Sequence, residues 1–186
     1  YKQFYYIEDW KRSYPAFIDM AQPGLYVVGR AVDVHNRILD NYKLMKNKDI
    51  IPFLTTGAYG EFEPYKVEHM VLEALINGAG GITYFDFNRF DTPLDFYYHA
   101  KAMEAVQDHE DLIVDGVPQD ITGSNKTMLY SITVKGNEAI LLVGNYDRAN
   151  PETTIKLPFA PTVMKDLREK KDLKPQGATR NLSVPR

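Results

Sequence analysis

Short apolar runs that alternate with helical patterns are the feature of this sequence that most constrains its fold. Apolar and aromatic runs occupy residues 4–7, 25–28, 50–54 and 82–85, and each is typical of a β-strand closed by polar or glycine residues. After the second run, apolar residues recur at helical spacing, which predicts helices over 34–46, around 67–75 and over 94–106. Strands followed by helices through short loops predict a parallel sheet with right-handed crossovers.

Two of these helices carry more specific expectations. Asp33 stands just before the first apolar residue of the 34–46 pattern, so we expect it to cap that helix rather than to act as a catalyst. In the helix over 94–106, the apolar side chains Phe96, Ala100, Met103 and Val106 recur on one side. That side is expected to face the core.

The pattern changes after about residue 115, where alternating runs replace helices. Residues 126–134 and 138–146 form two such runs joined by Lys135, Gly136 and Asn137, which predicts a β-hairpin. A third strand is expected over 153–157, and the charge-rich stretch 165–174 is interpreted as a solvated surface segment or linker. The sequence therefore predicts two domains, an α/β domain over 1–114 and a small, incomplete antiparallel β domain over 115–186.

Composition excludes several classes of protein. The net charge of −3 gives no basic face for nucleic acid, and no apolar run approaches the roughly 18 residues of a membrane span. Without cysteine the chain has neither disulfides nor thiolate metal sites. Two N-x-[ST] sequons, at Asn125 and Asn181, permit secretion without establishing it. The chain opens at Tyr1, not Met, and we expect a fragment or a processed chain.

Three stretches resemble glycoside hydrolases with a (β/α)8 TIM-type barrel. They are IPFLTTG (51–57), GEF (60–62) and VLEALINGAGGITYF (71–85), and EDLIVDG (110–116) follows the last helix as it commonly does in those enzymes. The resemblance implies that residues 1–114 form about the last four βα units of the barrel, and that a C-terminal β-sandwich follows. The remainder of the same polypeptide or a partner chain would then complete the barrel. It also implies cleavage of glycosidic bonds in a carbohydrate substrate.

Glycoside hydrolysis needs two carboxyl groups, one as acid and one as nucleophile or base. In such barrels the site lies at the carboxyl ends of the strands, which selects Glu8 and Asp9 as catalytic candidates. Both follow the first strand and stand beside Trp10, where burial would raise the pKa of a carboxyl group. Because successive side chains point oppositely on a strand, only one of the two is expected to face the pocket. The alternative is that both belong to a solvated strand end.

Residues in the predicted loops at the same edge are candidates for substrate binding. Trp10, Tyr59 and Phe90 offer aromatic platforms for the apolar faces of sugars, and Asp86 could bind a sugar hydroxyl. Glu61 lies several residues beyond the third strand, where stabilisation of a helix N-terminus competes with a substrate role. The four histidines show no metal-ligand spacing, and the glycines at 78–81 precede a strand instead of following one. No metal or cofactor is therefore expected.

Three functional hypotheses remain open at this point. The first is a metal-independent glycosidase with paired carboxylates. The second is a catalytically inactive carbohydrate-binding or structural barrel protein, favoured by Thr55 and Thr56 standing where many related barrels place a nucleophile. The third is a small open α/β binding domain with an appended hairpin.

Overall fold

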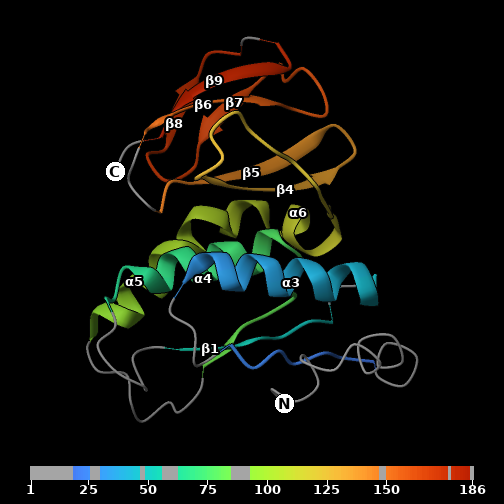
Figure 1. Ribbon diagram of the computed structural model, residues 1–186, viewed down its shortest axis with the longest axis vertical. Coiled ribbons are helices and arrows are strands. Elements are labelled where there is room, and N and C mark those ends of the chain that lie inside the picture. Colours follow the sequence, from blue (N-terminus) through green and yellow to red (C-terminus); the bar gives the residue numbers. More distant parts are fainter. Residues whose placement is uncertain are drawn as a thin grey trace.

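The computed structural model describes residues 19–25, 30–46, 49–55, 63–84, 93–146, 150–175 and 177–184. Short parallel segments form one layer, helices form the middle layer, and antiparallel strands form the third (Figure 1). The chain passes through these layers in two stages, because helices alternate with the parallel segments up to α5 and antiparallel strands dominate afterwards.

The parallel layer is made of three neighbouring segments in chain order. β1 (Phe53–Leu54) pairs in parallel with β2 (Thr83–Tyr84), and parallel bridges join Ala21 to Ile50 and Gly24 to Phe53. The carbonyl of Pro52 accepts a hydrogen bond from the Thr83 amide at 2.9 Å. Because proline has no amide proton, Pro52 cannot donate in return, and the regular ladder stays short.

The predicted partial barrel of about four βα units is wrong. In the described parts of the chain, the parallel pairing consists of two two-residue strands and isolated bridges, and the remaining strands form several small separate sheets. Three helices exceed ten residues, and no barrel is present among the described residues. Described residues of these runs, such as Leu25, Ile50 and Leu54, do lie in the core, but burial of a run requires neither a long ladder nor closure of a sheet. The expected strand over 4–7 lies outside the described residues.

The three long helices lie close to their predicted positions. They are α3 (Ala31–Met45), α4 (Lys66–Ile76) and α5 (Pro93–Val106). Asp33 is not the N-cap of α3, because Arg30 holds that position and Asp33 lies inside the first turn. The Asp33 carboxylate instead accepts hydrogen bonds from Nε and Nη2 of Arg30 at 2.8 and 2.9 Å.

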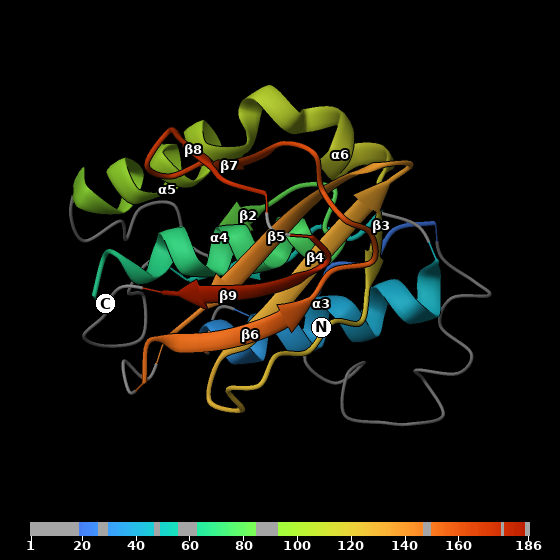
Figure 2. The ribbon, with the colours of Figure 1, turned by 90° about the horizontal axis from the view of Figure 1, so that it is seen from above.

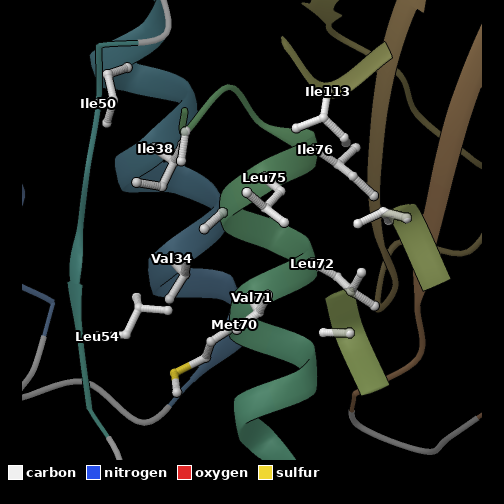
Figure 3. Close-up of a cluster of buried hydrophobic side chains, with 14 of the residues drawn as sticks. Val34, Ile38, Ile50, Leu54, Met70, Val71, Leu72, Leu75, Ile76 and Ile113 are labelled. Carbon is white, nitrogen blue, oxygen red and sulfur yellow. The ribbon is translucent and has the colours of Figure 1, made fainter. Parts of the chain in front are cut away.

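Helix α4 is the centre of the molecule. It packs beside α3 and α5, with the parallel segments on one side and the antiparallel strands on the other. Nine of its eleven residues are buried, which a helix enclosed by two layers requires. Figure 3 shows Val34 and Leu54 on one side of α4, while Leu72 and Ile76 point to the opposite side.

The buried side of α5 differs from the expectation. Asp95, Ala102 and Val106 are buried, whereas Phe96 and Met103 of the predicted core stripe are 46% and 39% exposed. Residue spacing places Phe96 and Met103 on one face, but only the neighbouring elements decide which face is covered. The chain then continues through the 3₁₀ turn η3 (Gln107–His109) and the short helix α6 (Glu110–Asp115).

The antiparallel layer contains three small sheets. β3 (Val117–Gln119), β4 (Leu129–Lys135) and β5 (Glu138–Gly144) form one, with the predicted hairpin between β4 and β5 confirmed. β6 (Glu152–Lys156) pairs with β9 (Thr179–Ser183), and this pair crosses over β4 and β5 (Figure 2). β7 (Met164–Asp166) and β8 (Lys171–Leu173) form a hairpin. Most of residues 165–174 are exposed, so the stretch is a surface segment as expected, but it is not a linker.

The hydrophobic core crosses the predicted domain boundary near residue 115. One cluster contains residues of α3, α4, α5 and α6 together with Ile140 of β5. A smaller cluster joins Met128 and Tyr130 to Ile155, between the two larger antiparallel sheets. Among the described residues, no helix is both long enough and apolar enough to cross a membrane.

Candidate functional site at the carboxyl ends of the parallel strands

The carboxyl ends of the parallel segments meet at one edge of the molecule. Since β1 pairs in parallel with β2, and Gly24 with Phe53, the segments that follow residues 25, 55 and 84 all leave from this edge. Ligands of open α/β sheets bind outside the carboxyl ends of the strands. This edge is therefore where a site is expected first.

Three polar side chains come together there. Tyr84 is the last residue of β2, and its hydroxyl lies 2.7 Å from Nδ1 of His99 on α5. The two rings meet edge to face, with centroids 5.5 Å apart. Asp95 lies one turn before His99 on the same face of α5 and is only 2% exposed.

The environment keeps Tyr84 and His99 uncharged near neutral pH. Burial raises the pKa of the Tyr84 phenol well above its ordinary value, and the negative charge of Asp95 raises it further. Burial lowers the pKa of His99 below 6.5, because the imidazolium would lose hydration. The Tyr84 hydroxyl can then donate to Nδ1 of a neutral imidazole, and in this assignment Nε2 carries the ring proton.

This arrangement is suited to hydrogen bonding. A neutral imidazole next to a phenol can donate to and accept from hydroxyl groups. The described cluster holds one carboxylate, Asp95, whereas glycoside hydrolysis uses two. By itself the cluster therefore supplies groups for polar recognition, and not a complete glycosidase pair.

Exposed aromatic side chains also occur on α5, off the face that carries Asp95 and His99. Phe96 and Tyr97 follow Asp95 directly and are 46% and 57% exposed. The ring of Tyr97 contacts that of Tyr98 edge to face, with centroids 5.1 Å apart. An exposed ring presents a flat apolar surface, on which the C–H face of a sugar can lie.

None of the sequence-predicted site residues lies in the described part of the chain. The two catalytic candidates and five binding candidates fall within residues 1–18, 56–62 and 85–92: Glu8, Asp9, Trp10, Tyr59, Glu61, Asp86 and Phe90. Their roles remain predictions. In the chain, the stretches 56–62 and 85–92 come after β1 and β2, whose carboxyl ends lie at the edge that holds the Tyr84 cluster.

Sequence reasoning missed His99 and Asp95. The spacing of the four histidines gives no metal-ligand pattern that would single out His99. One signal was present, since Asp95 and His99 are four residues apart in a predicted helix and share one face. Within the described residues, no group of three or more His, Cys, Asp or Glu side chains could hold a metal ion.

A second polar cluster lies deep between the helices and the antiparallel sheet. The Glu73 carboxylate on α4 is fully buried and accepts four hydrogen bonds. Tyr146 donates to Oε1 at 2.8 Å, while Ser131, Asn77 and His35 approach Oε2 at 2.7, 2.9 and 3.0 Å. Both carboxylate oxygens therefore have hydrogen-bonding partners, three at Oε2 and one at Oε1. Burial and the charge of Glu73 raise the pKa of Tyr146 well above 10, which keeps it a donor.

This Glu73 cluster is structural, although it contains a serine, a histidine and a glutamate. Ser131 and Glu73 both contact Nδ1 of His35, at 2.9 and 3.0 Å. In a catalytic triad the serine and the acid contact opposite nitrogens of the imidazole. The Ser131 side chain is also fully buried. The cluster therefore joins α3, α4 and β4 and is not a nucleophilic centre.

Comparisons with protein-family models, with curated proteins and with solved structures found no match. The functional conclusion therefore depends on the residues and their geometry.

Proposed function

We propose that this chain acts on carbohydrate in the manner of a glycoside hydrolase, through a site at the carboxyl edge of the parallel segments. The observation that carries the proposal is the Tyr84–His99–Asp95 cluster at this edge. β1 and β2, the strands that precede the candidate binding residues in the sequence, end at this edge. The catalytic carboxylates in this proposal are Glu8 and Asp9, and no cofactor is needed.

Within this proposal Tyr84 and His99 bind and orient the sugar. A phenol and a neutral imidazole are donors and acceptors for hydroxyl groups, and neither repels a neutral ligand. Asp95 acts on these two groups through its charge, because its side chain is almost fully buried. It is therefore a positioning residue.

A second candidate function is carbohydrate binding without hydrolysis. The exposure of Phe96 and Tyr97 on α5 favours it, since exposed rings bind sugars without any catalytic group. The described cluster also contains a single carboxylate, which suffices for binding but not for glycosidic cleavage.

The test compares hydrolysis and binding in the same variants. Glu8→Gln and Asp9→Asn are assayed separately on a panel of aryl glycosides and polysaccharides, and binding is followed by calorimetry. Loss of hydrolysis with retained binding in at least one variant supports the glycosidase. Binding by a chain that hydrolyses no member of the panel supports the second function.

Two further variants test the cluster itself. Tyr84→Phe and His99→Gln are each expected to weaken glycan binding by about tenfold, because each removes a hydrogen-bonding group. Glu138→Gln, at an exposed strand end of the antiparallel layer, is the matched control. Glycan binding that is unchanged in both cluster variants would contradict this placement of the site.

A further inference from the structure

A cavity that is open to solvent lies between two sheets of the antiparallel layer. Its volume is about 280 Å³, and its apolar lining consists of Ile121, Ile132, Leu157 and Pro158. Ile132 is 2% exposed, whereas Ile121 and Leu157 are half-buried, so Ile132 forms the floor. A water molecule takes about 30 Å³ of the liquid, so the cavity has the size of roughly nine waters, which suits a small organic molecule.

The pairing of the strands places the residues around this cavity. Gln119 ends β3 directly opposite Ile132 of β4, and directly opposed residues share one face of a sheet. Ser131 and Thr133, on either side of Ile132, point to the helices, because their hydroxyls donate to groups of α4. Ile132 and Gln119 therefore face the β6–β9 pair, which crosses over this sheet (Figure 2). Lys156, the last residue of β6, lines the cavity from that pair.

The polar groups at the rim leave one positive charge uncompensated. The Asp120 carboxylate lines the cavity and pairs with Nζ of Lys43 at 2.8 Å. The exposed ammonium group of Lys156 pairs with no carboxylate in the parts of the chain that the structure describes. The side-chain amide of Gln119 has no hydrogen-bond partner among the same residues. A free cation and a free amide thus stand above an apolar floor.

We propose that this cavity binds a small organic carboxylate with an aliphatic or aromatic body. The body lies on Ile132 and Leu157 and displaces water from them. The carboxylate lies at the rim, where the Lys156 ammonium and the Gln119 amide donate hydrogen bonds to it. A neutral ligand gains nothing from the charge of Lys156, and a cation is repelled by it. The site is apart from the Tyr84–His99 cluster and goes beyond the carbohydrate function proposed above.

The experiment follows the side-chain methyl signals of isoleucine by NMR in the full chain. Sodium hexanoate is the probe, and 1-hexanol, hexylammonium chloride and sodium acetate are titrated separately at the same ionic strength. Ile132→Val assigns the Ile132 signal. Lys156→Gln is expected to weaken hexanoate binding by about threefold, the effect of one exposed charge pair, and to leave hexanol binding unchanged. Lys165→Gln, at an exposed position of β7 outside the cavity lining, is the matched control.

The expected result is a saturable shift of the Ile132 signal that needs less hexanoate than hexanol, with no shift by hexylammonium or acetate over the same range. Equal midpoints for hexanoate and hexanol would show an apolar hollow without charge selection and would overturn the proposal. Hexanoate binding that is equally strong in wild type and Lys156→Gln, or no saturable shift at all, would overturn it too. Tyr84→Phe should leave the titration unchanged, so its outcome is separate from that of the proposed function.

Discussion

At the scale of single residues, buried polar groups with complete sets of partners connect the layers. Glu73 accepts hydrogen bonds from side chains of α3, α4 and β4 and from Tyr146 beyond β5. A buried carboxylate is costly unless it is hydrogen-bonded, and here both oxygens have partners. Each donor has a partner only when the antiparallel sheet lies correctly against α4, so the cluster selects one arrangement of the layers.

Glu73→Gln is expected to destabilise the protein by about 3 kcal/mol. The glutamine side chain carries no negative charge. Its NH2 group also points a donor at the surrounding side chains, which are themselves donors. The free energy of unfolding is measured by urea denaturation, and Glu138→Gln, at an exposed position, should change it by less than about 0.5 kcal/mol. Equal effects of the two substitutions would show that the Glu73 cluster does not stabilise the fold.

His99 makes the stability of the fold depend on pH. Its pKa in the folded state lies below 6.5 because of burial, so the unfolded chain takes up the proton at a higher pH than the folded chain. The stabilisation is complete above the unfolded pKa near 6.5 and is lost as pH falls through the lower folded pKa. Urea midpoints of wild type and His99→Gln between pH 8 and pH 4 should therefore converge toward acid pH. Parallel midpoint curves would contradict the burial effect.

At the scale of elements, close backbone approaches determine where helices give way to strands. Gly116 follows α6 and precedes β3, and its amide donates to the Leu112 carbonyl at 3.0 Å. A Cβ atom at this position would lie 2.3 Å from the Leu112 carbonyl oxygen and 2.4 Å from Cγ2 of Thr133. Neither the helix end nor β4 can move away easily, because both are packed in the core.

Gly116→Ala is expected to destabilise the protein by about 2–3 kcal/mol through overpacking. Gly136→Ala is the matched control, since Gly136 has φ of +59° but no atom within 4 Å of an added Cβ. Its cost is limited to the backbone conformation, about 1 kcal/mol. Thermal unfolding of both variants measures the difference, and a Gly116 variant no less stable than the Gly136 variant would refute the close approach.

At the scale of the whole molecule, the helices and the antiparallel sheet share one core. Ile140 belongs to the same cluster as the residues of α4, and the Thr133 hydroxyl donates to the Ile76 carbonyl at 2.7 Å. The stabilities of two parts that share a core are coupled, because separating them exposes apolar surface on both.

We therefore expect a single cooperative unfolding transition. Amide signals of β5 and of α3, followed by NMR through a urea titration, should disappear at the same midpoint. As a control for probe-dependent effects, the far-UV circular dichroism of the same samples should give that midpoint too. Two separated midpoints would show that residues before and after 115 fold as independent domains.

The sequence by itself determined the type and position of most elements, because their signals are local. The 3.6-residue spacing located α3, α4 and α5, and the Lys135–Asn137 turn located the β4–β5 hairpin. The short strands β3, β7, β8 and β9 were missed, since three to five residues carry little periodicity and the β7–β8 hairpin is rich in charge.

Only the tertiary structure decided how these elements combine. The same strand–helix order is compatible with a barrel or with short parallel segments beneath a helix layer, because sheet closure depends on non-local pairing. The tertiary structure also decided that α5 buries Asp95 and brings His99 to Tyr84. Asp95 and His99 are 11 and 15 residues from Tyr84 in the sequence, so no local spacing encodes these interactions. Burial then sets the charge of these groups, and with it what the site can bind.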